Sequence, residues 1–275
     1  MATRIDGKVI SAQIREEIKE ATAAFVAERG YAPGLAVVIV GEDPASQVYV
    51  RNKALACEQV GFYSEVHRLP AQTKQEELNA LVDRMNADEK IHGILVQLPL
   101  PKHLDETEVL LRIDPKKDVD AFHPYNVGKI MIGDYDFLPC TPAGVMEMLK
   151  FEGIDPAGKH AVVIGRSNIV GKPMAMLLTN RSGTVTVCHS KTNNLIDFTK
   201  NADISKKGNE YTLKFTDQTA KQYIFDCFDL SNAIMPEQAV SNKEFKEALL
   251  AVKDFCDNIP VFGQDGLVMK LKKNS

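Results

Sequence analysis

The first hundred residues alternate between helical and extended hydrophobic patterns. From Val9 to Arg29, apolar side chains recur every three or four residues, which predicts an amphipathic helix that ends near Gly30. Residues 35–40 form a continuous apolar run, typical of a strand in a parallel sheet that is covered on both faces, and residues 93–98 are predicted as a second buried strand. Between these runs, residues 42–46 read as a turn and the start of a helix that runs to about residue 60, and the pattern predicts a short strand at 66–69 and a helix at 74–86. This alternation indicates a doubly wound α/β unit.

The middle of the chain contains a second strand–helix–strand pattern. We expect helices at 106–112, 143–151 and 172–179 and strands at 161–164 and 184–187. Residues 118–120 read as extended, and His123, Pro124 and Asn126 read as part of a loop. The predicted fold is therefore α/β, with two doubly wound domains around a cleft, the second of them Rossmann-like.

The pattern changes beyond residue 205. Residues 211–215 and 223–228 alternate like the strands of an antiparallel hairpin. An amphipathic helix is expected at 244–256 and an edge strand at 266–271. The order β,β,α,β does not continue the preceding βαβ pattern. We therefore expect three segments: a domain at 1–140, a partial Rossmann-like domain at 141–204 and an atypical tail at 205–275.

Composition narrows the class of protein. Hydrophobic residues make up 44% of the 275 residues and charged residues 25%, as in an ordinary globular protein. The net charge of −4 argues against a general nucleic-acid binder. Five scattered cysteines without a C-x-x-C pair favour reduced thiols, and no apolar run approaches the roughly 20 residues of a membrane span. With no signal peptide, we expect a cytoplasmic protein without a membrane or nucleic-acid partner.

Three residues of the first domain are candidates for proton chemistry. Tyr49 and Lys53 lie one helical turn apart, so both can face one cleft beyond the carboxyl end of a strand. Gln97 interrupts the second apolar strand near its carboxyl end. A buried amide needs partners, so Gln97 is either a satisfied core residue or a partner for a lysine or a substrate. An exposed Tyr/Lys pair is more often packing and solvation than catalysis, but this location favours a proton shuttle.

Asp118 and Asp120 are the second candidate set. At strand-like spacing, their carboxylates would share a face. Two carboxylates can bind a metal ion, but no His or Cys at ligand spacing supports one, so we expect no metal. Loop capping is the alternative for either residue.

A third set predicts a dinucleotide site. Gly165 and Gly171 bracket a loop that follows an apolar strand and precedes a helix, where backbone N–H groups bind phosphate. Arg166 can bind a phosphate bidentately. His189 and Ser190 end the next strand, where the ribose or its 2′-phosphate would lie, although His189 alone is more often structural. The absence of an acidic residue at this strand end favours NADP over NAD.

Taken together and in this order, several runs resemble the methylenetetrahydrofolate dehydrogenase/cyclohydrolase family. The runs are VGEDPASQVYVRNK (40–53), GILVQLPLP (93–101), KDVD (117–120), FHPYN (122–126), PCTPAG (139–144), GRSNIVGKP (165–173) and VCHS (187–190). They lie within residues 1–204, about three quarters of the chain. The resemblance implies a bifunctional enzyme of one-carbon folate metabolism, which contributes to purine biosynthesis and is usually a homodimer.

The resemblance also implies roles for individual residues. Lys53 would be the essential proton-transfer group, Gln97 would support it, Tyr49 would line the folate site and Asp120 would hold the pterin ring. Arg166 and Ser190 would contact the NADP 2′-phosphate. The other residues implied for the coenzyme site are Gly165, Ser167, Val170, Gly171, Pro173 and His189.

The chain departs from the family in two places. Ala121 stands where the family has glycine, and the family's remaining coenzyme loops are absent after residue 204. We therefore expect dehydrogenase activity to be impaired more than cyclohydrolase activity. The alternatives are a folate-binding protein with lost or reduced dehydrogenase activity, and a dehydrogenase of another substrate, such as shikimate, on the same scaffold. The set Tyr49, Lys53, Gln97 and Asp120 argues against the last.

Overall fold

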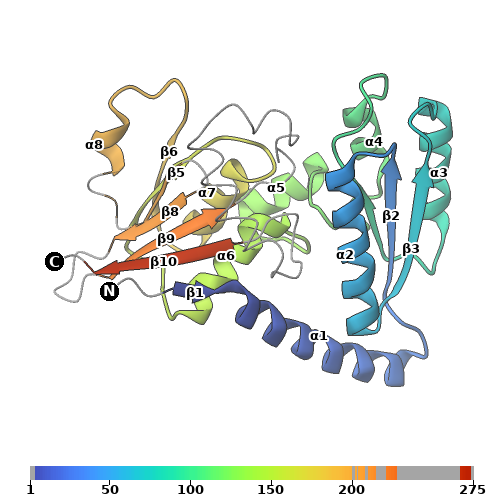
Figure 1. The fold of residues 1–275 in the computed structure, drawn as a ribbon, viewed down its shortest axis with the longest axis horizontal. Helices are drawn as coiled ribbons and strands as arrows, with labels where there is room; N and C mark the ends of the chain where they lie inside the picture. Colours follow the sequence, from blue (N-terminus) through green and yellow to red (C-terminus); the bar gives the residue numbers. More distant parts are fainter. Residues whose placement is uncertain are drawn as a thin grey trace. The chain divides into compact units, whose positions relative to one another are not determined.

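The computed structural model describes residues 4–199, 202, 204–207, 210–214, 221–227 and 267–273 (Figure 1). The chain forms two compact units. The N-terminal unit comprises Ala12–Lys129 and Asp134–Leu138. The C-terminal unit comprises Met1–Ser11, Ile130–Gly133 and Pro139–Ser275, so the start of the chain belongs to it.

The N-terminal unit is built on a three-stranded parallel sheet. Strand β2 (Gly34–Val40) lies between β3 (Tyr63–Leu69) and β4 (Gly93–Val96). The helices are α2 (Pro44–Val60), α3 (Gln75–Ala87), α4 (Glu106–Arg112) and parts of α1 (Gly7–Arg29) and α5 (Pro124–Ile132). The prediction of a doubly wound parallel sheet is confirmed for this unit.

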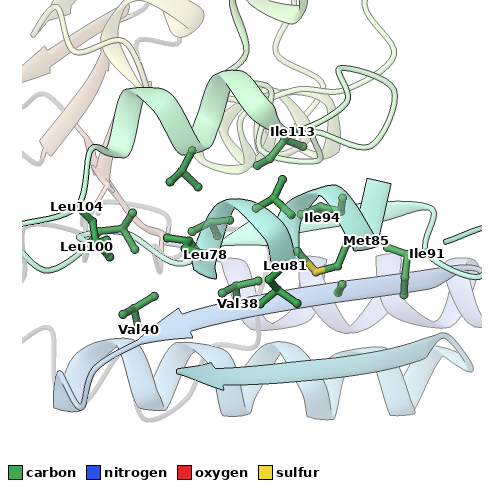
Figure 2. Packing of buried hydrophobic residues seen from close by; sticks show 14 residues of the cluster. Val38, Val40, Leu78, Leu81, Met85, Ile91, Ile94, Leu100, Leu104 and Ile113 are labelled. Carbon is green, nitrogen blue, oxygen red and sulfur yellow. The ribbon is translucent and has the colours of Figure 1, made fainter. Parts of the chain in front are cut away.

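Strand β2 is buried on both faces because its side chains alternate between two cores. Val38 and Val40 belong to the cluster with α3 and α4, and Figure 2 shows Leu78 and Leu81 of α3 on this side of the strand. Val37 and Ile39 pack on the other face with Val50 of α2. This two-sided burial explains why residues 35–40 form a continuous apolar run.

The C-terminal unit contains a seven-stranded mixed sheet in the order β1-β10-β9-β8-β7-β5-β6. Strand β5 (His160–Ile164) pairs in parallel with β6 (Thr184–Cys188) and β7 (Ile204–Lys207), and α7 (Gly171–Asn180) connects β5 to β6. This is the predicted Rossmann-like unit. Helices α6 (Cys140–Phe151) and α8 (Leu195–Thr199) precede β5 and follow β6, respectively.

The strands after residue 205 extend this sheet in antiparallel fashion. Strands β8 (Glu210–Lys214) and β9 (Lys221–Cys227) form the predicted hairpin, and β10 (Leu267–Lys273) lies beside β9 (Figure 1). The prediction that 266–271 form an edge strand is wrong. Strand β1 (Arg4–Asp6) pairs with the other side of β10, which places Arg4 opposite Lys270. The helix expected at 244–256 lies outside the described residues.

Three further expectations differ from the structure. Residues 118–120 form an isolated bridge and a turn instead of an extended strand. The expected loop at 123–126 opens helix α5, because proline is compatible with the first helical position. Strand β4 ends at Val96, so Gln97 lies just beyond the strand instead of within it.

Candidate active site

Lys53 and Gln97 form a buried pair in the N-terminal unit. The Lys53 ammonium donates a hydrogen bond to Gln97 Oε1 over 3.2 Å. Lys53 is 9% exposed and Gln97 is 2% exposed. The Gln97 amide in turn donates through Nε2 to the carbonyl of Leu98 at 2.7 Å. The amide thus has an acceptor for its own hydrogens while its oxygen holds the lysine, so the interpretation of Gln97 as a lysine partner is confirmed.

The local fold brings these two side chains to one edge of the sheet. Helix α2 starts directly after β2, and Asp43 caps it by accepting from the Ser46 N–H at 2.8 Å. Lys53 lies nine residues into this helix, on its buried face. Gln97 N donates to Val38 O at 2.8 Å, which places Gln97 beside the carboxyl-terminal half of β2. Open α/β sheets bind ligands at this edge.

Asp120 adds a carboxyl group with unusual ionisation. Loss of water around the carboxyl raises its pKa from 3.8 to about 6. The charge of Lys53 acts in the opposite direction and the charge of Asp118 adds to the rise. Asp120 therefore changes its charge near neutral pH, which suits a group that binds or transfers protons.

Asp118 caps the turn that precedes α5. It is 2% exposed, and its Oδ2 accepts from His123 N at 2.8 Å and from Asn126 Nδ2 at 2.9 Å. The loop-capping interpretation is thus confirmed for Asp118. The shared face expected from strand-like spacing is not formed, because the chain turns at these residues.

Tyr49 lies one turn before Lys53 on α2 and is half-buried. Its role at the folate site stays a prediction. No group of three His, Cys, Asp or Glu residues that could hold a metal ion occurs among the described residues. Within the same part of the chain, no helix has both the length and the apolar character of a membrane span.

The dinucleotide loop joins β5 to α7 in the C-terminal unit. Gly165 has φ +137°, which side chains rarely adopt. A Cβ atom on Gly171 would lie 2.3 Å from Gly165 O, so only glycine allows the start of α7 to pack against the loop. Gly165 is thus required by its backbone conformation and Gly171 by the close backbone approach, as in loops that bind pyrophosphate.

The side chains of this loop divide into two groups. Ser167 Oγ accepts from the N–H groups of Val170 and Gly171 at 3.1 and 3.2 Å, so it caps α7. Val170 and Pro173 are buried, whereas Arg166 is exposed and available to an anion. The arrangement fits a dinucleotide, with Arg166 as the cation of the loop.

His189 and Ser190 lie at the same edge of the sheet as this loop. Strands β5 and β6 are paired in parallel with Ile164 opposite Cys188, and Gly165 N donates to Cys188 O at 2.8 Å. Ser190 is exposed. His189 Nδ1 accepts from Lys191 N at 3.1 Å, which favours a structural role for the imidazole. Sequence reasoning missed Thr192, whose hydroxyl accepts from His189 N at 2.8 Å and closes the turn.

The molecule therefore combines a buried Lys53–Gln97 pair with a strand–loop–helix of the kind that binds dinucleotides, an arrangement typical of an α/β dehydrogenase. The family model described as the tetrahydrofolate dehydrogenase/cyclohydrolase catalytic domain matches residues 5–120. The model for the NAD(P)-binding domain of the same family matches residues 139–208. The chain belongs to the tetrahydrofolate dehydrogenase/cyclohydrolase family.

Individual relatives agree with this assignment. Bifunctional protein FolD of Moorella thermoacetica is 62% identical over 200 residues, which cover 73% of this chain and 71% of the relative. The crystal structure of the FolD enzyme of Campylobacter jejuni has 51% identity and a TM-score of 0.70, and covers 73% of this chain and 71% of that one. The Trypanosoma brucei enzyme, complexed with NADP and an inhibitor, has 40% identity and a TM-score of 0.71 over 75% of this chain and 71% of its own.

These matches favour a bifunctional enzyme of folate one-carbon metabolism over a folate-binding protein without turnover. The family assignment also argues against the alternative that the chain is a dehydrogenase of another substrate, such as shikimate. The second of the two family models ends at residue 208, so β8, β9 and β10 lie beyond the matched region.

Proposed function

We propose that this chain oxidises 5,10-methylenetetrahydrofolate with NADP and hydrolyses the resulting methenyl group to 10-formyltetrahydrofolate. When held by the loop between Gly165 and Gly171, NADP would supply the hydride acceptor for the methylene carbon of the folate. In the second step, water adds to the methenyl cation, one carbon–nitrogen bond of the ring opens, and one proton is released. This hydrolysis needs a group that moves protons but no coenzyme.

The observation that carries the proposal is the buried pair of Lys53 and Gln97, whose Nζ and Oε1 atoms lie 3.2 Å apart. Lys53 moves the protons of the hydrolysis. Gln97 fixes the ammonium through its oxygen, because its amide hydrogens are directed to Leu98 O. The environment contains few competing solvent molecules, since both side chains are almost fully buried.

Asp120 and Tyr49 complete the folate site in this proposal. The carboxyl of Asp120 accepts hydrogen bonds from the pterin ring, and its pKa of about 6 leaves it mainly ionised at neutral pH. Tyr49 lines the site one turn away from Lys53 on α2. We assign folate binding and catalysis to residues 1–140, of which residues 12–129 and 134–138 make up the N-terminal unit.

Arg166 and Ser190 hold the NADP 2′-phosphate in the Rossmann-like domain at 141–204. The pairing of β5 with β6 supports this role, because it brings both residues to one sheet edge. Gly165 and Gly171 shape the loop, Ser167 caps α7, and Val170, Pro173 and His189 support it. We further propose a cytoplasmic homodimer without nucleic-acid or membrane partners, as the family resemblance and the composition suggest.

The test is Lys53→Met, which removes the ammonium while keeping a side chain of similar length. Hydrolysis of methenyltetrahydrofolate should fall by at least ~10²-fold, because a positioned acid–base group contributes about this much. Lys53→Arg should also be inactive, since the guanidinium is too weak an acid to give up a proton near neutral pH.

The matched control is Lys129→Met, which removes a lysine that pairs with Asp136 at 2.5 Å. This variant should hydrolyse the substrate at a rate close to that of the parent chain. Near-normal hydrolysis by a folded Lys53→Met protein would show that Lys53 has no such role.

A further inference from the structure

A buried side-chain pair closes the turn that carries Asp120. Asp118 Oδ2 accepts from Asn126 Nδ2 at 2.9 Å, and Asn126 is 3% exposed. The same amide nitrogen of Asn126 donates to Pro115 O at 2.9 Å. The side chain of Asn126, at one end of the segment 115–126, therefore binds both Pro115 at the other end and Asp118 between them.

Backbone hydrogen bonds tighten the same segment. Asp118 Oδ2 also accepts from His123 N at 2.8 Å, and Asp118 O accepts from Ala121 N at 3.2 Å. Ala121 is 1% exposed and has φ 55°, a left-handed conformation that few side chains adopt. A residue in this conformation persists only where the surrounding contacts impose it. The bond from Ala121 N to Asp118 O is one such contact.

We propose that the Asp118–Asn126 pair is a positioning device of the folate site, which holds the turn so that the Asp120 carboxyl stays beside Lys53. This inference rests on the proposed role of Asp120. Asp118 itself has no contact with substrate in the proposal. Its buried carboxylate accepts hydrogen bonds from His123 N and Asn126 Nδ2 and acts on the folate site through Asp120.

The charge of Asp118 has a second consequence for Asp120. The charged groups that act on the Asp120 carboxyl are Lys53 from α2 and Asp118 from its own turn, in opposite directions. Removal of the Asp118 charge should therefore lower the pKa of Asp120 from about 6 toward its ordinary value of 3.8. The titration of Asp120 in Asp118→Asn thus reports whether the Asp118 carboxylate lies close to Asp120 in the folded protein.

Two variants separate the effect of the Asp118 charge from the effect of the Asn126 hydrogen bonds. Asp118→Asn keeps an oxygen that accepts from His123 N and Asn126 Nδ2 but removes the charge. Asn126→Ala keeps the charge but removes the bonds to Asp118 and Pro115. The matched control is Asn86→Ala, which releases the segment directly before residue 115 by losing its bonds with Arg112 O and Asp114 N at 2.8 and 2.9 Å, but leaves the Asp118–Asn126 bond in place.

The first measurement is the carboxyl carbon-13 titration of Asp120 by NMR, assigned with Asp120→Asn. Asp118→Asn should lower the pKa of Asp120, whereas Asn86→Ala should not change it. This measurement needs no substrate, so it is independent of the proposed reaction. An unchanged titration in Asp118→Asn would overturn the inference.

The second measurement is the kinetics of methenyltetrahydrofolate hydrolysis. Asn126→Ala should raise KM at least ~10-fold, because a small displacement of Asp120 weakens folate binding. It should lower kcat much less, since the Lys53–Gln97 bond is retained. A folded Asn126→Ala protein with parental KM would overturn the inference even where Asp118→Asn does not fold. Failure of the proposed function itself would show separately, as hydrolysis retained in Lys53→Met.

Discussion

Asp120 is the residue whose ionisation the fold changes most clearly. Its carboxyl loses water on folding, and the charge of Lys53 compensates only part of that loss, so its pKa rises to about 6. In the unfolded chain, the same carboxyl ionises near 3.8. Between these two values the folded state binds more protons than the unfolded state, so this group's contribution to the free energy of unfolding falls as pH rises.

Replacing Asp120 by Asn tests this linkage. Asn resembles the protonated carboxyl, so the loss of stability between about pH 4 and pH 7 should become smaller. At pH 8 the variant should be more stable than the parent chain by about 1–3 kcal/mol, since one pKa unit corresponds to about 1.4 kcal/mol. Denaturant unfolding across this pH range measures the effect. Parallel pH profiles for the two proteins would contradict it.

Arg166 offers a test of coenzyme choice at a single side chain. Arg166→Ala should weaken binding of NADP by about 1.5–3 kcal/mol, because a charge-assisted bond to the 2′-phosphate is lost, while NAD binding should change little. Calorimetry with both coenzymes measures this difference. The control is Lys172→Ala, which removes a nearby cation in the first turn of α7, where Lys172 bonds Asn168 Oδ1 at 2.6 Å. Equal losses for both coenzymes in Arg166→Ala would mean that Arg166 only shapes the loop.

At the scale of elements, the end of helix α3 depends on a residue far away in sequence. The ammonium of Lys117 donates to Met85 O, Asn86 O and Asp88 O at 3.0, 2.8 and 2.8 Å. These carbonyls lie at the carboxyl end of α3, where a helix has unpaired acceptors and a partial negative charge. Lys117 therefore fastens α3 to the segment that leads to Asp118 and Asp120.

Lys117→Met should destabilise the protein by about 2 kcal/mol, because three carbonyl groups lose a charged donor. The neighbouring Lys116 is exposed, so Lys116→Met serves as the control and should change stability by less than about 0.5 kcal/mol. Chemical unfolding of the three proteins measures both values. If the two variants are equally stable, Lys117 does not fasten the helix.

At the scale of the whole molecule, the two proposed activities depend on different parts of the chain. The residues proposed for hydrolysis lie in the N-terminal unit, within the region that the catalytic-domain model matches. The coenzyme loop lies on a sheet that is completed by β8, β9 and β10, beyond the matched region. Hydride transfer requires accurate placement of the coenzyme, so it is more sensitive to this difference.

We therefore predict that the ratio of dehydrogenase to cyclohydrolase turnover is lower than in a relative such as the Campylobacter jejuni enzyme. Both activities are measured on one preparation of each protein, so that differences in active fraction cancel. An equal ratio would mean that the sheet completed by the antiparallel strands positions the coenzyme as well as the relative's domain does.

Local sequence patterns were sufficient to predict most elements and the residue types of the site. The continuous apolar run at 35–40 predicts a strand buried on both faces, and β2 has this environment. The spacing of Tyr49 and Lys53 predicts one helix, and the amide of Gln97 in an apolar run predicts a polar partner, which is Lys53. These features depend on a few neighbouring residues and on burial, both of which are visible in a sequence.

Long-range pairing was decided only by the tertiary structure. No local pattern reveals that Arg4–Asp6 pairs with β10 and makes that strand internal, because strand pairing depends on segments more than 250 residues apart. The closed turn around Asp118 is similar, since its carboxylate holds His123 N and Asn126 where a local reading gave an extended segment and a loop. The ionisation of Asp120 follows from this turn and from Lys53 on α2, because desolvation and charge act through space and not along the chain.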